Sequence, residues 1–140
     1  MATIQRAVLS DIPELIRLIN GYAAQGIMLP RKEFEMAENI RDFVVAREGS
    51  ELVGCGALHV MWEDLGEVRT VAVLPDVKGQ GVGGAILEAL VGEARRRGHA
   101  AVVLSAQVQA VGFYRKFGFE AYGPVYEEAG IPHQDMRRRL

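Results

Sequence analysis

The stretch VAVLPDVKGQGVGGAIL, residues 71–87, decides the fold of this 140-residue chain. An apolar run meets Pro75, four glycines follow within residues 79–84, and helix-forming residues come next. Glycine destabilises regular structure, so such a cluster needs a reason. At a strand-to-helix junction, glycine lets a ligand approach the backbone, and the first helical N–H groups can hold an anion. The stretch therefore predicts a backbone cradle for phosphate or pyrophosphate, with a tight turn for close helix–sheet packing as the alternative.

Two known phosphate-binding motifs do not fit the stretch. A P-loop requires Lys followed by Ser or Thr after the last glycine, whereas Ala85 and Ile86 stand there. The spacing Gly79-x-Gly81-x-x-Gly84 does match the dinucleotide-binding fingerprint. That fingerprint also needs an acidic residue about 20 positions on, at the end of the next strand. Residues 104–106, Leu-Ser-Ala, supply none.

The hydrophobic periodicity around the stretch predicts a mixed α+β domain that covers residues 1–140. Two strands, 67–74 and 100–104, flank one helix that ends at Gly98, and such a βαβ unit places its strands parallel. The sheet should hold six or seven strands and be largely antiparallel, with the segments 43–47 and 51–62 forming a hairpin. Further strands are expected at 3–8, 119–122 and 135–140, and further helices at 10–23, around 34–40 and at 108–117.

Local signals add detail to the predicted helices. Ser10 is expected to cap the first helix, and Phe34, Ala37 and Ile40 should form the buried face of the second. Cys55 lies in an apolar run, which indicates a buried side chain that is neither a nucleophile nor half of a disulfide.

Composition limits the function classes. The chain is 49% hydrophobic and 24% charged, with a formal net charge of −2, so no strong field favours nucleic acid or an anionic membrane. The arginine clusters at 95–97 and 137–139 are typical of a helix end or a solvated face. No segment resembles a signal peptide or approaches the ~20 apolar residues that a membrane span needs. A soluble, cytoplasmic protein is expected.

Two motifs together resemble the GNAT superfamily of acetyl-CoA-dependent N-acetyltransferases. The register Lys78-Gly79-Gln80-Gly81-Val82-Gly83 is similar to the pyrophosphate-binding motif of that family, with Lys78 where Arg or Gln is usual. Residues 72–76, Ala-Val-Leu-Pro-Asp, resemble the end of the family's fourth strand. Residues 113–119, Phe-Tyr-Arg-Lys-Phe-Gly-Phe, resemble its second signature, and Gln107 stands where the family often has Asn. The resemblance implies the three-layer α/β/α GNAT fold.

The same resemblance implies acetyl-CoA as co-substrate and no metal. The backbone at Val71 and Val73 would hold the pantetheine arm, and one of their N–H groups would polarise the thioester. The residues implied for acetyl-CoA binding are Val71, Ala72, Val73, Lys78, Gly79, Gln80, Gly81, Val82, Gly83, Gly84 and Gln107.

Acetyl transfer to an amine needs a base for the amine and benefits from an acid for the departing thiolate. Glu67 matches a strand-four glutamate that some family members use as a base, although a solvated carboxylate at a strand end is the alternative. Arg69 would project from the same face. It would either weaken Glu67 as a base or bind a carboxylate of the acceptor. Tyr114 matches the family's frequently catalytic tyrosine and is the candidate acid.

Two different resemblances bear on the acceptor. Residues 22–84 resemble the short N-acetylglutamate synthases of bacterial arginine biosynthesis, notably in residues 26–31, Gly-Ile-Met-Leu-Pro-Arg, and in 62–73. This implies the α-amine of L-glutamate as acceptor, with Arg31 and Arg69 binding its carboxylates. Residues 106–133 instead resemble other small GNAT proteins of unsettled substrate, and His133 could border the acceptor pocket.

Three functions therefore stay open. They are acetylation of a small amine such as L-glutamate, acetylation of a peptide or protein amine, and non-catalytic sensing of acyl-CoA. The expected partner is a small-molecule amine rather than nucleic acid or a membrane, and a homodimer stays open.

Overall fold

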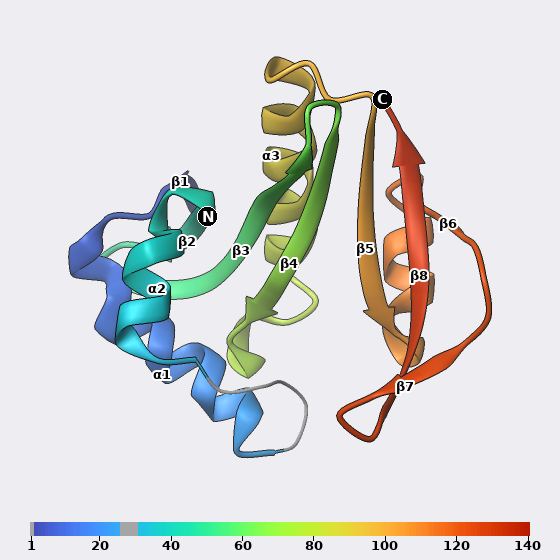
Figure 1. Ribbon diagram of the computed structural model, residues 1–140. Helices are drawn as coiled ribbons and strands as arrows, with labels where there is room; N and C mark the ends of the chain where they lie inside the picture. Colours follow the sequence, from blue (N-terminus) through green and yellow to red (C-terminus); the bar gives the residue numbers. More distant parts are fainter. Residues whose placement is uncertain (1, 26–30) are drawn as a thin grey trace. The chain divides into compact units, whose positions relative to one another are not determined.

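The computed structural model describes residues 2–25 and 31–140 (Figure 1). Its helices are α1 (Ile12–Ala23), α2 (Glu33–Asn39), α3 (Val82–Arg96) and α4 (Val111–Arg115). Its strands are β1 (Thr3–Arg6), β2 (Phe43–Glu48), β3 (Glu51–Trp62), β4 (Leu65–Val73), β5 (Ala101–Gln107), β6 (Glu120–Ala121), β7 (Tyr126–Glu128) and β8 (Ile131–Arg139).

The strands follow the order β1-β2-β3-β4-β5-β8-β6, and β7 pairs with β8. β4 and β5 are parallel, as the βαβ pattern predicts, whereas β2 is antiparallel to both β1 and β3. The sheet is thus mixed and mostly antiparallel, with helices beside it, which confirms the predicted fold class.

Two compact units divide the chain. The first comprises Met1–Ala57 and Thr70–Leu90, and the second comprises Leu58–Arg69 and Val91–Leu140. The strands β3 and β4 and the helix α3 each contribute residues to both units. A single domain over residues 1–140 stays a prediction.

In the first unit, one sheet face packs against α1 and α2. Apolar residues of α1 lie in this core, and Cys55 is completely buried, as expected. This core contains Ile12, Leu15, Leu18, Ile19, Tyr22, Met36, Ile40, Phe43, Val45, Leu52, Cys55, Ala57 and Ala72.

The opposite face of the first unit lies close against α3. A Cβ atom on Gly54 would come within 2.8 Å of Ile86 Cδ1, and one on Gly56 within 2.6 Å of Ile86 Cγ2. Because real Cβ atoms do not approach so closely, these two glycines let the helix backbone lie near the strand. The close approach at Gly54 and Gly56 positions the first turns of α3 against β3. It thereby also positions the glycine-rich turn that precedes the helix.

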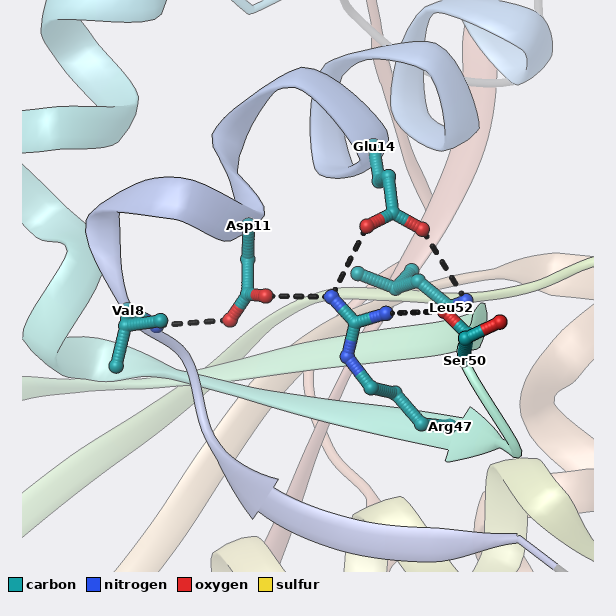
Figure 2. A network of polar contacts seen from close by, with 6 residues as sticks. All are labelled: Val8, Asp11, Glu14, Arg47, Ser50 and Leu52. Carbon is teal, nitrogen blue, oxygen red and sulfur yellow. Dashed lines mark hydrogen bonds and ion pairs between the residues drawn. The ribbon is translucent and has the colours of Figure 1, made fainter.

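A network of polar side chains joins the start of α1 to β2 (Figure 2). Arg47 donates to Asp11 Oδ1 at 2.5 Å and to Glu14 Oε1 at 3.0 Å. Asp11 Oδ2 accepts the N–H of Val8 at 2.8 Å, and the Asp11 side chain is only 6% exposed. The two carboxylates raise the pKa of Arg47, so the guanidinium stays charged. The network therefore compensates the charge of a buried aspartate.

We expect Arg47→Met to lower the free energy of unfolding by about 3 kcal/mol, because it leaves the Asp11 carboxylate buried without its cation. Adding Asp11→Asn to the same chain should recover part of this loss, since the buried charge is then gone. Urea unfolding followed by circular dichroism measures both effects. Arg41→Met is the matched control, because Arg41 is an exposed arginine in the same unit. An equal loss in both single variants would contradict the prediction.

In the second unit, β5 and β8 run antiparallel side by side over seven register pairs, from Ala101 opposite Arg139 to Gln107 opposite His133 (Figure 1). The short helix α4 and the turn after it lie behind these strands, where Arg138 donates to the Phe117 carbonyl at 2.6 Å. Val102, Leu104, Ala106 and Met136 are buried.

Several local predictions were wrong. Ser10 does not cap α1, because residues 9–11 form a short 3-10 turn and the side chain of Asp11 takes the nearby N–H of Val8. Phe34 is 60% exposed and Ala37 is also exposed, so Met36 is the buried residue of α2, whereas Ile40 is buried as predicted. The sequence also did not predict β7. A two-residue turn with positive φ at Ala129 (52°) and Gly130 (77°) joins β7 to β8, a geometry that suits a tight hairpin.

Within the described ranges 2–25 and 31–140, no helix has the length and apolar character that a membrane crossing requires.

Candidate functional site

The glycine-rich turn of the first unit has the backbone geometry of an anion site. Gly79 and Gly81 have φ values of 85° and 82°, and a Cβ on either would meet no atom within 4 Å. These glycines are therefore required by conformation and not by lack of space. The Ala85 N–H donates to the Gly81 carbonyl at 3.0 Å, which opens α3. The N–H groups of residues 82–84 thus lack a carbonyl one helical turn earlier, at the positive end of the helix dipole.

Lys78 adds a positive charge next to this turn. Lys78 is exposed, and its Nζ atom lies 5.1 Å from the centre of the Tyr22 ring. The Tyr22 hydroxyl donates to the Val73 carbonyl at the end of β4. The sequence analysis did not link Tyr22 to the turn. A buried tyrosine hydroxyl usually finds a partner, which is the one signal that could have indicated such a role.

The end of β4 offers a backbone donor. The Leu74 N–H donates to the Val53 carbonyl of β3 at 2.8 Å. Because successive residues of a strand direct their N–H groups to opposite edges, the Val73 N–H points away from β3. The Val73 carbonyl already accepts the Tyr22 hydroxyl. Of the two backbone groups of Val73, the N–H is therefore the one suited to hold a pantetheine arm.

Thr70 interrupts β4 with a φ of 54°, which is unusual for a β-branched residue. Arg31 donates from Nη2 to Thr70 Oγ1 at 3.0 Å, and the Cys55 thiol donates to the Thr70 carbonyl at 3.4 Å. Burial raises the pKa of the Cys55 thiol to about 12, so the proton needed for that hydrogen bond stays in place. Arg31, predicted to bind a carboxylate, thus reaches the backbone irregularity of β4. Residues 26–30, which carry part of the resemblance to N-acetylglutamate synthases, lie outside the described residues.

Glu67 and Arg69 of the second unit form an ion pair in which Arg69 Nε donates to Glu67 Oε1. The side chain of Glu67 is 22% exposed and that of Arg69 is 42% exposed, so solvent reaches both. Arg69 also lies 3.8 Å from the Met61 sulfur. The two side chains share one face of β4, as predicted. The base and carboxylate-binding roles stay predictions.

Tyr114 lies on α4 among aromatic rings. Its ring packs edge-on against Phe113 at 5.1 Å and Phe119 at 6.0 Å between centroids. Burial raises the pKa of the Tyr114 hydroxyl to about 12. The phenol therefore keeps its proton at any physiological pH and can act as a hydrogen-bond donor.

Gln107 and His133 are opposite one another in the register of β5 and β8. Gln107 Oε1 accepts from Gln109 at 2.6 Å. His133 Nδ1 contacts the Ile131 carbonyl at 2.7 Å, and its ring stacks on Tyr126 with centroids 6.0 Å apart. The structure thus brings these two predicted residues together at one end of the second unit.

Comparison with known proteins gives the family. Residues 23–140 match the acetyltransferase (GNAT) domain. The chain belongs to the GNAT family. The amino-acid acetyltransferase of Mycobacterium tuberculosis (strain ATCC 25618 / H37Rv) is 43% identical to this GNAT chain over 95 residues, which are 66% of the chain and 54% of that relative. The chain therefore spans about half the length of this relative.

Two solved structures resemble this GNAT protein over nearly its whole length. The protein Rv2747 from Mycobacterium tuberculosis, in complex with CoA, has a TM-score of 0.88 and 28% identity, with 99% of both chains covered. The N-acetylglutamate synthase from Neisseria gonorrhoeae, complexed with coenzyme A and N-acetyl-glutamate, has a TM-score of 0.86 and 25% identity. The similar region includes all of this chain and 35% of the synthase.

These findings confirm the predicted GNAT family and fold, and the CoA found in both structures agrees with acetyl-CoA as the predicted co-substrate. They do not test the individual GNAT site residues, which stay predictions. The sequence analysis assigned no site role to five residues that the structure places near the predicted ones. They are Tyr22, Thr70, Ser105, Tyr126 and Asp135.

Proposed function

We propose that the chain transfers an acetyl group from acetyl-CoA to a primary amine by direct attack in a ternary complex. The observation that carries this proposal is the turn before α3, where Gly79 and Gly81 adopt positive φ directly ahead of the N-terminus of a 15-residue helix. Helix N-termini of this kind suit phosphate groups. When bound, acetyl-CoA would supply an acyl group activated as a thioester.

Most of the residues predicted to bind the donor belong to the first unit. The N–H groups of residues 82–84 and the Lys78 ammonium would neutralise the pyrophosphate, because both provide positive potential at the start of α3. The N–H groups of Val71 and Val73 would pair with the pantetheine arm as a further strand would. Thr70, held by Arg31 and Cys55, sets the backbone direction just before Val71. The remaining predicted contacts are Ala72, Gln80 and Gln107.

Glu67 is the proposed base. Its carboxylate is partly exposed on β4, and it would take the proton from the acceptor's amine. Arg69 holds one oxygen of that carboxylate, which fixes its orientation. An acceptor carboxylate that binds Arg69 would compete with this pairing and free Glu67 for the proton transfer.

Tyr114 is the proposed donor to the departing thiolate. A thiol has a pKa of about 8.5, well below the value of about 12 for the Tyr114 hydroxyl. Complete transfer of the phenolic proton would therefore be uphill, and a hydrogen bond to the thiolate is the favourable interaction. The role of Tyr114 is then to stabilise negative charge with little movement of its proton.

We expect Tyr114→Phe to lower kcat about ten-fold, which corresponds to losing one hydrogen bond to a charged atom. The Kd for CoA should change little, because the ring and its contacts with Phe113 and Phe119 remain. Since the pKa of the hydroxyl is about 12, its ionisation should cause no loss of wild-type rate up to roughly pH 10. Stopped-flow detection of free thiol across this range measures both. An alkaline loss near pH 9 that disappears in Tyr114→Phe would contradict the proposed role.

The α-amine of L-glutamate is the first acceptor to test. Support comes from the relatives that are named as amino-acid acetyltransferases and from the N-acetylglutamate synthase structure. Arg31 and Arg69 would bind its carboxylates, with His133 near the same acceptor, in a cytoplasmic step of arginine biosynthesis. Another small amine, or a peptide or protein amine, is the alternative acceptor, and a non-catalytic acyl-CoA sensor is the alternative function.

Release of free CoA thiol against a panel of amino acids, simple amines and peptides tests the proposal. Turnover with L-glutamate supports the full proposal. Turnover with another amine alone would contradict the acceptor and leave acetyl transfer supported. CoA binding without turnover on any acceptor would favour the sensor, and absence of CoA binding would overturn the assignment of the turn before α3.

A further inference from the structure

One sheet face of the second unit carries a row of polar side chains. Side chains alternate between faces along a strand, and the residues at odd positions of β5 and β8 lie opposite one another, with Ser105 opposite Asp135 and Gln107 opposite His133. The even positions, such as Leu104 and Met136, are buried on the other face. In the parallel pairing, Glu67 of β4 is opposite Val103 of β5. Ser105 is thus the next residue along the same face from the position beside Glu67.

Hydrogen bonds within this row have a fixed direction. Tyr126 donates from its hydroxyl to Asp135 Oδ1 at 2.6 Å, and the Ser105 hydroxyl contacts the same tyrosine oxygen. A tyrosine hydroxyl has one proton. Because the carboxylate takes that proton, Ser105 must donate its own proton to Tyr126. Burial and the hydrogen bond to Asp135 both raise the pKa of Tyr126, which keeps the phenolic proton in place.

The direction of these hydrogen bonds decides whether the Ser105 hydroxyl can donate to a ligand or only accept from it. Its single proton is used toward Tyr126, so the exposed oxygen presents lone pairs only. On His133, Nδ1 donates to the Ile131 carbonyl, because a carbonyl can only accept. Asp135 adds a negative charge at the end of this hydrogen-bonded series that is farthest from Ser105.

Two cations on this face, Arg69 and Arg137, have partners. Arg69 is paired with Glu67, and Arg137 lies over the Tyr122 ring at 4.9 Å from its centroid. Around Ser105 the row therefore combines hydrogen-bond acceptors with an acidic group, which is the arrangement that binds an ammonium ion.

We infer that Ser105, Tyr126 and Asp135 form a binding subsite for the amino group of the acceptor, taken up as its ammonium ion. The inference rests on the proposed acetyl transfer and adds the residues that recognise the amine. Ser105 accepts one ammonium N–H. The two hydrogen bonds that connect Ser105 through Tyr126 to Asp135 polarise the Ser105 oxygen and make it a stronger acceptor. Glu67, one residue pair away on the same face, then receives the proton that makes the amine nucleophilic. Ser105 contacts the acceptor, whereas Tyr126 and Asp135 act as positioning residues.

Three variants separate this subsite from the base. Ser105→Ala removes the exposed acceptor, Asp135→Asn keeps an oxygen for Tyr126 but removes the charge, and Tyr126→Phe frees the Ser105 proton. Each should raise KM for the amine about ten-fold, the value of one charge-assisted hydrogen bond, and change kcat less than about three-fold. Ser50→Ala is the matched control, since its hydroxyl lies in an exposed turn of the other unit. An unchanged KM in Ser105→Ala and Asp135→Asn, or a loss of kcat alone, would overturn the inference.

Binding of methylammonium, measured by NMR titration with CoA present, tests the subsite independently of turnover. Methylammonium should shift the resonances of Ser105, Tyr126 and Asp135, and Ser105→Ala should abolish those shifts while the Kd for CoA stays unchanged. Shifts without thiol release on any acceptor would support the subsite and contradict the proposed acetyl transfer. Thiol release together with no shifts in this row would contradict the subsite and leave the acetyl transfer supported.

Discussion

Gly81→Ala should weaken CoA binding about 10²-fold. Gly81 has a φ of 82°, and an alanine in the left-handed region costs roughly 1–2 kcal/mol. If the turn relaxes to avoid this cost, the N–H groups of residues 82–84 change direction, and charge-assisted hydrogen bonds of about 1.5–3 kcal/mol each are lost. Isothermal titration with CoA measures the change in Kd.

Gly92→Ala in the same helix is the control for this experiment. Gly92 lies within α3, and a Cβ there would meet no atom within 4 Å. An alanine at such a helix position should stabilise the fold by about 0.5–1 kcal/mol and leave the Kd for CoA unchanged. If both variants bind CoA as the wild type does, the turn before α3 does not hold the pyrophosphate.

The sequence predicted the features that depend on neighbouring residues. The glycines between Lys78 and Ile86 indicated a special turn, and two of them, Gly79 and Gly81, adopt positive φ. The strand–helix–strand pattern predicted the parallel pairing of β4 with β5. The family signatures gave the family. In each case, the residues that decide the structure are close together in the chain.

Features that depend on distant residues could not be predicted. The hydrogen bonds from Ser105 through Tyr126 to Asp135 require the registers of both β5 and β7 against β8. The β7–β8 register is set by a hairpin turn at Ala129 and Gly130 that the sequence analysis did not recognise. The positive φ of Thr70 has no sequence signal, because threonine normally avoids this region. The direction of a hydrogen-bond chain is likewise invisible until all of its partners are placed.

Glu67→Gln should have the largest effect on the chemical step, with kcat reduced about 10²–10⁴-fold, the usual contribution of a general base. Glutamine keeps the size of the side chain and can still accept from Arg69, so the fold and the Kd for CoA should not change. Glu93→Gln is the matched control, because Glu93 is also paired with arginines, Arg96 and Arg97, in the second unit.

Arg69→Met separates the two roles that stay open for the Glu67–Arg69 pair. If Arg69 binds an acceptor carboxylate, its loss raises KM for L-glutamate and leaves KM for an amine without a carboxylate unchanged. If Arg69 acts only by holding Glu67, the change affects both acceptors equally and falls on kcat. Steady-state thiol release with L-glutamate and with methylamine distinguishes these outcomes.

A Glu67→Gln variant that retains wild-type kcat with every accepted amine would contradict the proposed base. It would show that Glu67 is a solvated carboxylate at the start of β4 and that the base lies elsewhere.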